Sequence, residues 1–136
     1  MSTSIDQALF TKLTGTTALT AIVGTRITDG WRQNDAGLPS VVINRVSTRP
    51  FGTSSGTDKN RTIGFEITVE AQTPAQARVI AEIIASESVL LGWKSTDPVS
   101  GPFRWGGDTY TTINPVTGEN YGYGRIVQEF TVTLKI

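Results

Sequence analysis

Residues 62–71 and the segment after them constrain the fold more than any other part of the sequence. This run, TIGFEITVEA, is apolar at every second position: Ile63, Phe65, Ile67, Val69 and Ala71. The intervening positions are polar residues or glycine. Such alternation predicts a strand of a sheet that has one face against a core and the other against water. The chain must then place a second layer over the apolar face.

The sequence after this strand carries a strong helix-start signal. Thr73 is a candidate N-cap, Pro74 occupies the first helical position and Gln76 the third. In this capping box, the Thr and Gln side chains satisfy two backbone amides that the helix leaves unpaired. The pattern predicts a helix from residue 74 to about Val89. A sheet strand therefore leads directly into a helix that can cover it.

This helix has more apolar residues than one face needs. Four of them form the stripe expected to lie on the sheet: Ala77, Ile80, Ala81 and Ile84. Val79 and Ile83 lie to one side of that stripe, so they predict a second contact. The contact is either with the N-terminal helix of the same domain or with another subunit.

The other periodic segments complete the predicted fold. Helical spacing appears at residues 4–14 and, for a short turn, at 19–24. Strand patterns appear at residues 25–31, 40–47, about 102–113, and 125–136, of which the last is expected to pair centrally. We predict one α+β domain over residues 1–136, with a mainly antiparallel sheet of four to five strands. Two or three helices are expected to pack on one face of it.

Two segments lack a clear period. Residues 48–61 predict a long flexible loop, which is locally basic and whose partner-contacting residues we expect to be Arg49, Phe51, Lys59 and Arg61. A loop of this length in a compact domain is usually functional or disordered. Residues 94–124 predict an irregular region rich in Gly and aromatic residues. Those aromatic side chains are expected to fill the core first, to anchor a protein contact second, and to stack on bases least.

Composition excludes several classes of function. Twelve basic residues balance twelve acidic ones, so no overall charge favours phosphate or membrane binding. The absence of His and Cys excludes the Ser-His-Asp and Cys-His catalytic arrangements and zinc sites built on imidazole or thiolate. We therefore predict no catalytic, cofactor-binding or metal-binding residues. No apolar run reaches the ~18 residues of a membrane span, and the first residues show no signal peptide, so no membrane partner is expected.

One carboxylate pair leaves an enzymatic alternative open. Glu66 and Glu70 lie four residues apart on the polar face of the 62–71 strand. Two carboxylates can do acid and base chemistry, but this spacing is also typical of a solvated strand exterior. A small carboxylate-dependent enzyme, or a nucleic-acid-binding module, is therefore the alternative from another class.

The order of the segments resembles a known family. ALFTKLTGTTALTAIVGTRI is followed by LPSVVINRVS, by the long loop, and by FEITVEAQTPAQARVIAEIIAS, and a last strand closes the chain. This order is similar to that of the tail-completion, or tail-terminator, proteins of long-tailed bacteriophages. The resemblance covers residues 8–86 well and residues 126–136 loosely, and residues 94–124 carry no matching pattern.

The resemblance implies a structural virion protein rather than an enzyme. Such proteins form a ring, typically a hexamer, at the head-proximal end of the tail tube. There the ring terminates tube polymerisation and joins the tail to the head. The implied partners are further copies of the chain, the tail tube protein and a connector or stopper protein. Genomic double-stranded DNA would pass through the lumen without sequence-specific binding.

In that setting, Val79 and Ile83 are the expected subunit interface, and the 48–61 loop is expected to contact a partner. The implied location is the tail or neck of the virion, after assembly in the host cytoplasm. Another neck protein, such as a head-closure or stopper ring, is the alternative within the same setting.

Overall fold

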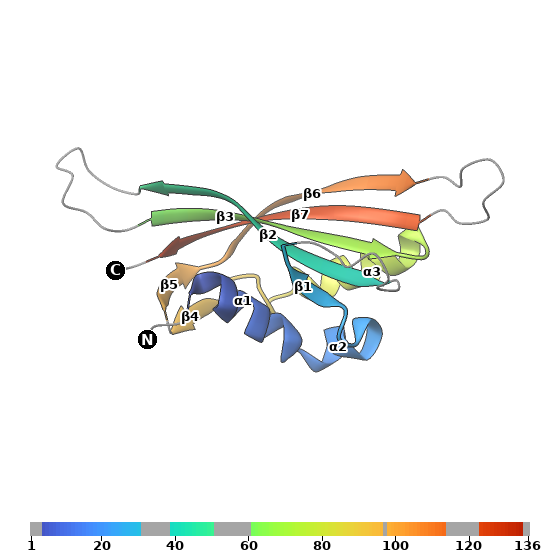
Figure 1. The fold of residues 1–136 in the computed structure, drawn as a ribbon, viewed down its shortest axis with the longest axis horizontal. Helices are drawn as coiled ribbons and strands as arrows, with labels where there is room; N and C mark the ends of the chain where they lie inside the picture. Colours follow the sequence, from blue (N-terminus) through green and yellow to red (C-terminus); the bar gives the residue numbers. More distant parts are fainter. Residues whose placement is uncertain (1–3, 31–38, 51–60, 97, 114–122, 135–136) are drawn as a thin grey trace.

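The computed structural model describes residues 4–30, 39–50, 61–96, 98–113 and 123–134. Its three helices are α1 (Ile5–Thr14), α2 (Thr17–Val23) and α3 (Pro74–Ile84). Its strands, drawn in Figure 1, are β1 (Ile27–Asp29), β2 (Ser40–Pro50), β3 (Arg61–Ala71), β4 (Lys94–Thr96), β5 (Val99–Pro102), β6 (Arg104–Ile113) and β7 (Tyr123–Leu134). None of the helices in these ranges is long and apolar enough to cross a membrane.

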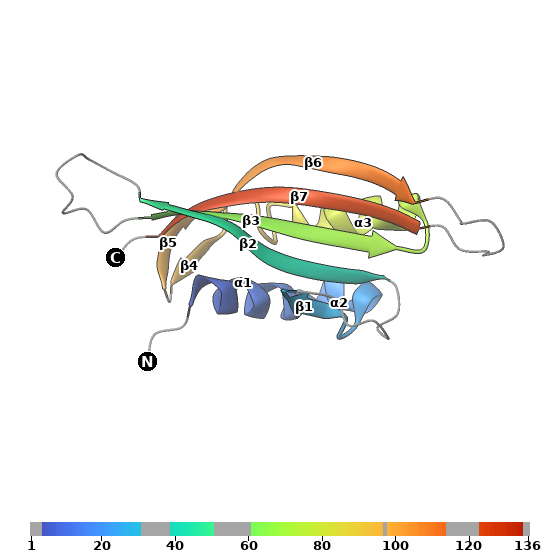
Figure 2. The same cartoon turned by 45° about the horizontal axis from the view of Figure 1, so that its top comes forward.

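The strands form one seven-stranded sheet whose long strands are antiparallel. Its order is β1-β2-β3-β7-β5-β4, and β6 also pairs with β7. Among the described strands, the short β1 alone pairs in parallel, with residues 41–43 of β2. β7 lies in the centre, as predicted, because β3 pairs along one of its edges while β6 and β5 share the other. The helices lie on one face of the sheet, and the other face is open (Figure 2).

The predicted alternation of β3 matches its burial. Ile63, Phe65, Ile67, Val69 and Ala71 are all buried. They belong to the same buried core as three side chains of α1, namely Ile5, Leu9 and Leu13. Phe103 adds to this core, with its ring centroid 6.2 Å from that of Phe65 and 5.1 Å from that of Trp93. Part of the aromatic cluster therefore fills the core.

The α+β class is correct, but four to five strands was an underestimate. The additional strands β4 and β5 have three and four residues. Segments this short cannot show a two-residue period, and Pro98 and Pro102 lie within or beside them. Their pairing depends on contact with distant β7, where Ser100 lies opposite Leu134.

The two segments predicted to be irregular contain more regular structure than expected. β2 continues to Pro50 and β3 begins at Arg61, so both ends of the predicted 48–61 loop belong to paired strands. Similarly, β4, β5 and β6 occupy most of residues 94–113, and β7 already begins at Tyr123. The cross-strand partner supplies the order that these polar, Gly-rich segments do not show on their own.

Helix α3 ends at Ile84, five residues before the predicted Val89. The Ser86 hydroxyl donates a hydrogen bond to the carbonyl oxygen of Ile83 at 2.7 Å. The Leu90 amide then donates to the carbonyl of Ile84 at 3.2 Å. The chain thus turns after Ile84, and Val89 and Leu90 are buried outside the helix.

Candidate interaction surfaces

Helix α3 is positioned by the corner at its start. The amide of Gln76 donates to Oγ1 of Thr73 at 3.1 Å, and Pro74 occupies the first turn, so the predicted cap is present. The corner packs closely on the start of β7. A Cβ atom at Gly124 would lie 2.6 Å from Cα of Pro74. Glycine is therefore required where β7 passes under the helix start.

The buried face of α3 is the predicted stripe. Ala77, Ile80, Ala81 and Ile84 are all buried. In addition, Nε2 of the fully buried Gln128 in β7 donates to the carbonyl oxygen of Ala81 at 2.9 Å. These contacts fix the rotation of the helix, so its remaining flanks have defined directions.

Val79 and Ile83 lie on a flank of α3 beside an open groove. The groove lies between α3 and the start of α2 and is also lined by Thr16 and Ala18. The Val79 side chain is 49% exposed, whereas Ile83 is half-buried and packs against the core. Within the domain, this flank of α3 therefore lies next to α2. Helix α2 leaves the Val79 side chain partly exposed.

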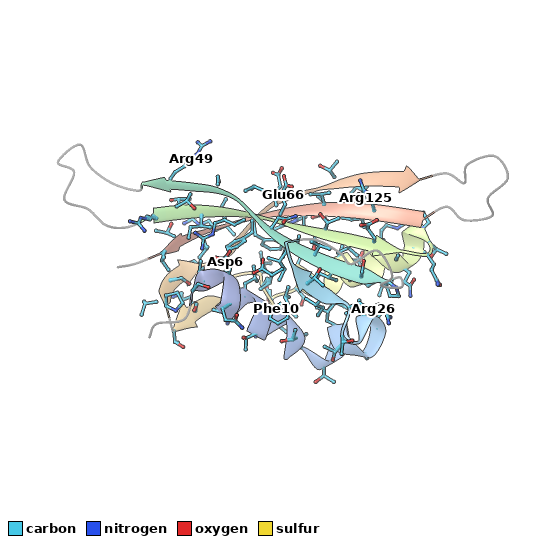
Figure 3. All side chains as sticks on the ribbon, in the orientation of Figure 1. Asp6, Phe10, Arg26, Arg49, Glu66 and Arg125 are labelled. Atoms are coloured by element: carbon cyan, nitrogen blue, oxygen red, sulfur yellow. The ribbon has the colours of Figure 1, made fainter. Side chains whose placement is uncertain are left out.

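The structure places two of the four predicted loop residues. Arg49 lies at the end of β2 and Arg61 at the start of β3, and both side chains are exposed. Arg49 pairs with Thr62 and points away from the helices (Figure 3). Phe51 and Lys59 lie outside the described residues. Two cations therefore mark one end of the sheet.

The face of the sheet opposite the helices carries the candidate carboxylates. Glu70 lies 3.8 Å from Nη2 of Arg125, beside an open hollow that also involves Asn44 and Thr68. Glu66 lies directly opposite Glu129 across the β3–β7 pair. Figure 3 shows Glu66 and Arg125 on this open face. The carboxylates are thus spread along a sheet surface.

This arrangement gives the enzymatic alternative little support. Glu70 already has a cationic neighbour, and the hollow beside it does not include Glu66. Among the residues in the described ranges, no cluster of three His, Cys, Asp or Glu side chains is placed to hold a metal ion.

Two of the aromatic residues that were expected to fill the core instead lie on an exposed surface. Trp105 and Tyr110 of β6 are 47% and 63% exposed. Nε1 of Trp105 donates to Oδ1 of Asp108 at 2.7 Å, and the Tyr110 hydroxyl donates to Oδ2 of Asp108 at 3.4 Å. These side chains sit on a strand that is paired with β7 along only one edge within the described part of the sheet. Their exposure could not be predicted because it depends on β6 being the last strand.

Comparison with known proteins supplies a family and a fold. The sequence profile of the family described as tail completion protein gp17 matches residues 7–90, which is more than half of the chain. A solved chain from the virion of a native gene transfer agent (GTA) particle is similar with a TM-score of 0.70 and 17% sequence identity. The alignment covers 98% of this chain and 96% of that one, so the fold is shared over nearly the whole length. No curated protein matches the sequence.

Proposed function

This chain belongs to the tail completion protein gp17 family, and on that premise we propose that it forms a ring at the head-proximal end of a phage tail tube. The ring, a hexamer, stops further polymerisation of the tube and joins the tail to the connector or stopper protein of the head. The family match over residues 7–90 carries this proposal, because it contains most of α1, all of α2 and α3, and the strands between them. The similarity to a chain of a virion particle supports the same setting.

A closed ring requires two different patches on each subunit, one of which meets the other on the next copy. The flank of α3 with Val79 and Ile83 is our candidate for one patch. Val79 is half exposed inside a groove, which lets a neighbouring side chain cover it. Covering the exposed half of a valine contributes on the order of 1 kcal/mol per subunit.

The end of the sheet with Arg49 and Arg61 is our candidate for contact with the tail tube protein or a neighbouring subunit. Both arginines are exposed. In the sequence they flank Phe51 and Lys59, so an apolar anchor and a third cation belong to the same segment. Arginine and aromatic residues are enriched where protein surfaces bind one another.

Genomic DNA passes through the proposed ring without sequence recognition. Tight DNA binding depends on basic residues that neutralise phosphates. The described part of the open face carries mixed charges instead: Glu70 lies beside Arg125, and Glu66 lies opposite Glu129 across the β3–β7 pair. We propose that this face borders the channel, where its carboxylates would not retain the phosphate backbone.

Growth of tail tubes tests the proposal. Purified tube protein polymerises with and without this chain, and tube lengths are measured by electron microscopy. The proposal predicts shorter tubes that carry extra density at one end and bind connector protein there. Tubes of unchanged length with bare ends would contradict it.

A further inference from the structure

Two open strand edges lie on opposite sides of the sheet. On one side, β6 pairs with β7 along one edge and has no strand on its other edge within the described ranges. On the other side, β1 covers residues 41–43 of β2, and Arg45 and residues 47–50 are paired with β3 alone within the described ranges. Figure 2 shows β6 at the edge of the sheet away from β1 and β2. The backbone groups along both open edges are available to a partner.

The β6 edge beyond Gly107 lacks the features that usually prevent strand pairing. Such edges are commonly blocked by Lys, by Pro or by a bulge. β6 has a bulge between Trp105 and Gly107, where Gly107 has a φ of 131°. Beyond it, residues 108–113 read DTYTTI, with neither Lys nor Pro and with β-branched or aromatic residues at five of six positions. This composition favours a strand that acquires a neighbour.

The open part of β2 has a matching length. It comprises residues 45–50, and its last member, Pro50, has no N–H group to donate. Arg45 holds this strand to α1 through an ion pair with Asp6. Val46 is 53% exposed, and the side chains of Thr48 and Arg49 are also exposed. β2 has a bulge at Val46, so its regular residues 47–50 can receive residues 108–111 of β6.

We propose that residues 108–111 of β6 in one subunit pair with residues 47–50 of β2 in the next copy, so that the sheets join around the ring. This inference rests on the proposed ring. The strands β2, β3, β7 and β6 alternate in direction. When the next sheet continues this series, β6 is antiparallel to the neighbouring β2. Within one sheet, residues 108–111 are level with residues 40–43 of β2, so this pairing requires strands that are inclined to the ring axis. Antiparallel pairing is the more stable type.

The joined edges also explain how a ring can close. The β6 edge and the β2 edge differ, so their contact is heterologous and each subunit uses both. Pairing of β6 with a second β6 would instead be a two-fold contact. It would produce a dimer and leave both β2 edges open.

The proposed register defines which side chains meet. Aligning 108–111 antiparallel with 47–50 places Thr109 opposite Arg49 and Tyr110 opposite Thr48. Arg49 points to the open face, and Thr109 lies on that face too because it pairs with Val127 beside the hollow. Thr48 and Tyr110 are on the helix face, because they pair with the buried Ile63 and Ile126.

The absence of cysteine makes disulfide crosslinking a clean test. Two double variants place cysteines on the same face, R49C/T109C and T48C/Y110C. Two matched controls use the same four sites on opposite faces, R49C/Y110C and T48C/T109C. Each full-length variant is oxidised under conditions in which the ring forms, and products are separated on non-reducing gels. Thr111→Cys replaces Thr109→Cys in a further set, which samples a register shifted by two residues.

The inference predicts a ladder of covalent oligomers from the same-face variants, with roughly ten times less product from the controls, because a disulfide needs Cβ atoms about 4 Å apart.

Three results would overturn it. A ring whose variants never crosslink would show that the strand edges are apart, while leaving the proposed function intact. Dimers from T109C alone would show pairing of β6 with β6. If mass measurements detect no ring under any condition, the proposed function fails and this inference fails with it.

Discussion

The side chain of Gln128 in β7 donates a hydrogen bond from Nε2 to the main-chain oxygen of Ala81 in α3 at 2.9 Å. Gln128 is fully buried and belongs to a strand face that is otherwise apolar. The bond joins the central strand to the middle of the helix that covers it. It thereby fixes the direction in which the Val79 flank points.

Gln128→Glu is expected to destabilise the fold in a pH-dependent manner. A buried carboxylate cannot donate to the Ala81 oxygen, and burial raises the pKa of the introduced carboxyl. In the folded state that carboxyl holds its proton above the pH at which the unfolded chain releases it. The loss of stability is therefore smallest near pH 4 and grows as the pH rises, to about 3 kcal/mol above neutral pH. Urea unfolding across pH measures this change.

The control for that prediction is Gln72→Glu, at an exposed position just before α3. It should leave stability nearly unchanged at every pH. An equal loss at all pH values for Gln128→Glu would show that the amide fills space without its hydrogen bond being important.

Gly124→Ala is expected to cost about 1–3 kcal/mol, because the added methyl would overlap the backbone at Pro74. Backbone atoms at a capped helix start cannot move aside as a flexible side chain does. The matched control is Gly101→Ala in β5, where the nearest atom to the added Cβ, the Thr133 oxygen, is 3.7 Å away. Thermal unfolding compares the two variants, and similar melting temperatures would refute the close packing of this corner.

Val79→Asp is expected to preserve the folded monomer and to prevent ring formation. Val79 is 49% exposed, so a charge there costs little in the monomer but is unfavourable inside an apolar contact. Ile83→Asp is less informative, since Ile83 packs against the core. Val99→Asp, at a valine with 55% exposure on β5, is the control that should retain assembly. Unchanged ring formation by Val79→Asp would remove this flank from the interface.

Glu66→Gln is expected to stabilise the isolated protein by a few tenths of a kcal/mol. Glu66 lies directly opposite Glu129 in the antiparallel β3–β7 pair, and like charges at such positions repel. The gain should shrink at high salt, which screens exposed charges. Glu87→Gln, at an exposed position in the turn after α3, is the comparison that should show no gain. A salt-independent loss of stability would mean that Glu66 makes a favourable contact instead.

The strongest local patterns predicted the elements that hold this fold together. The alternation of residues 62–71, the Thr73–Pro74 cap and the final strand all appear where expected. These signals reside in neighbouring residues and need no distant partner. β4 and β5 are different, because three or four residues become a strand only when the rest of the sheet is present. The number of strands predicted from the sequence was therefore too low.

The candidate surfaces were predicted unevenly for a similar reason. The exposure of Val79 follows from helical spacing, which sequence alone provides. The open edges of β6 and β2 follow from strand order, which depends on pairings between distant segments. Likewise, the position of Glu66 opposite Glu129 needs the β3–β7 register. The family resemblance predicted a role in a phage tail, whereas the positions of the candidate interaction surfaces became clear only from the folded structure.

The mass of the purified protein, measured over a range of concentrations with and without tail tubes, tests the central claim most directly. The monomer has a mass of 14.6 kDa. We expect a species of about six subunits, either free in solution or formed only at tube ends, because a closed ring satisfies both patches of every subunit. A monomer at every concentration that leaves tube ends bare would contradict the account.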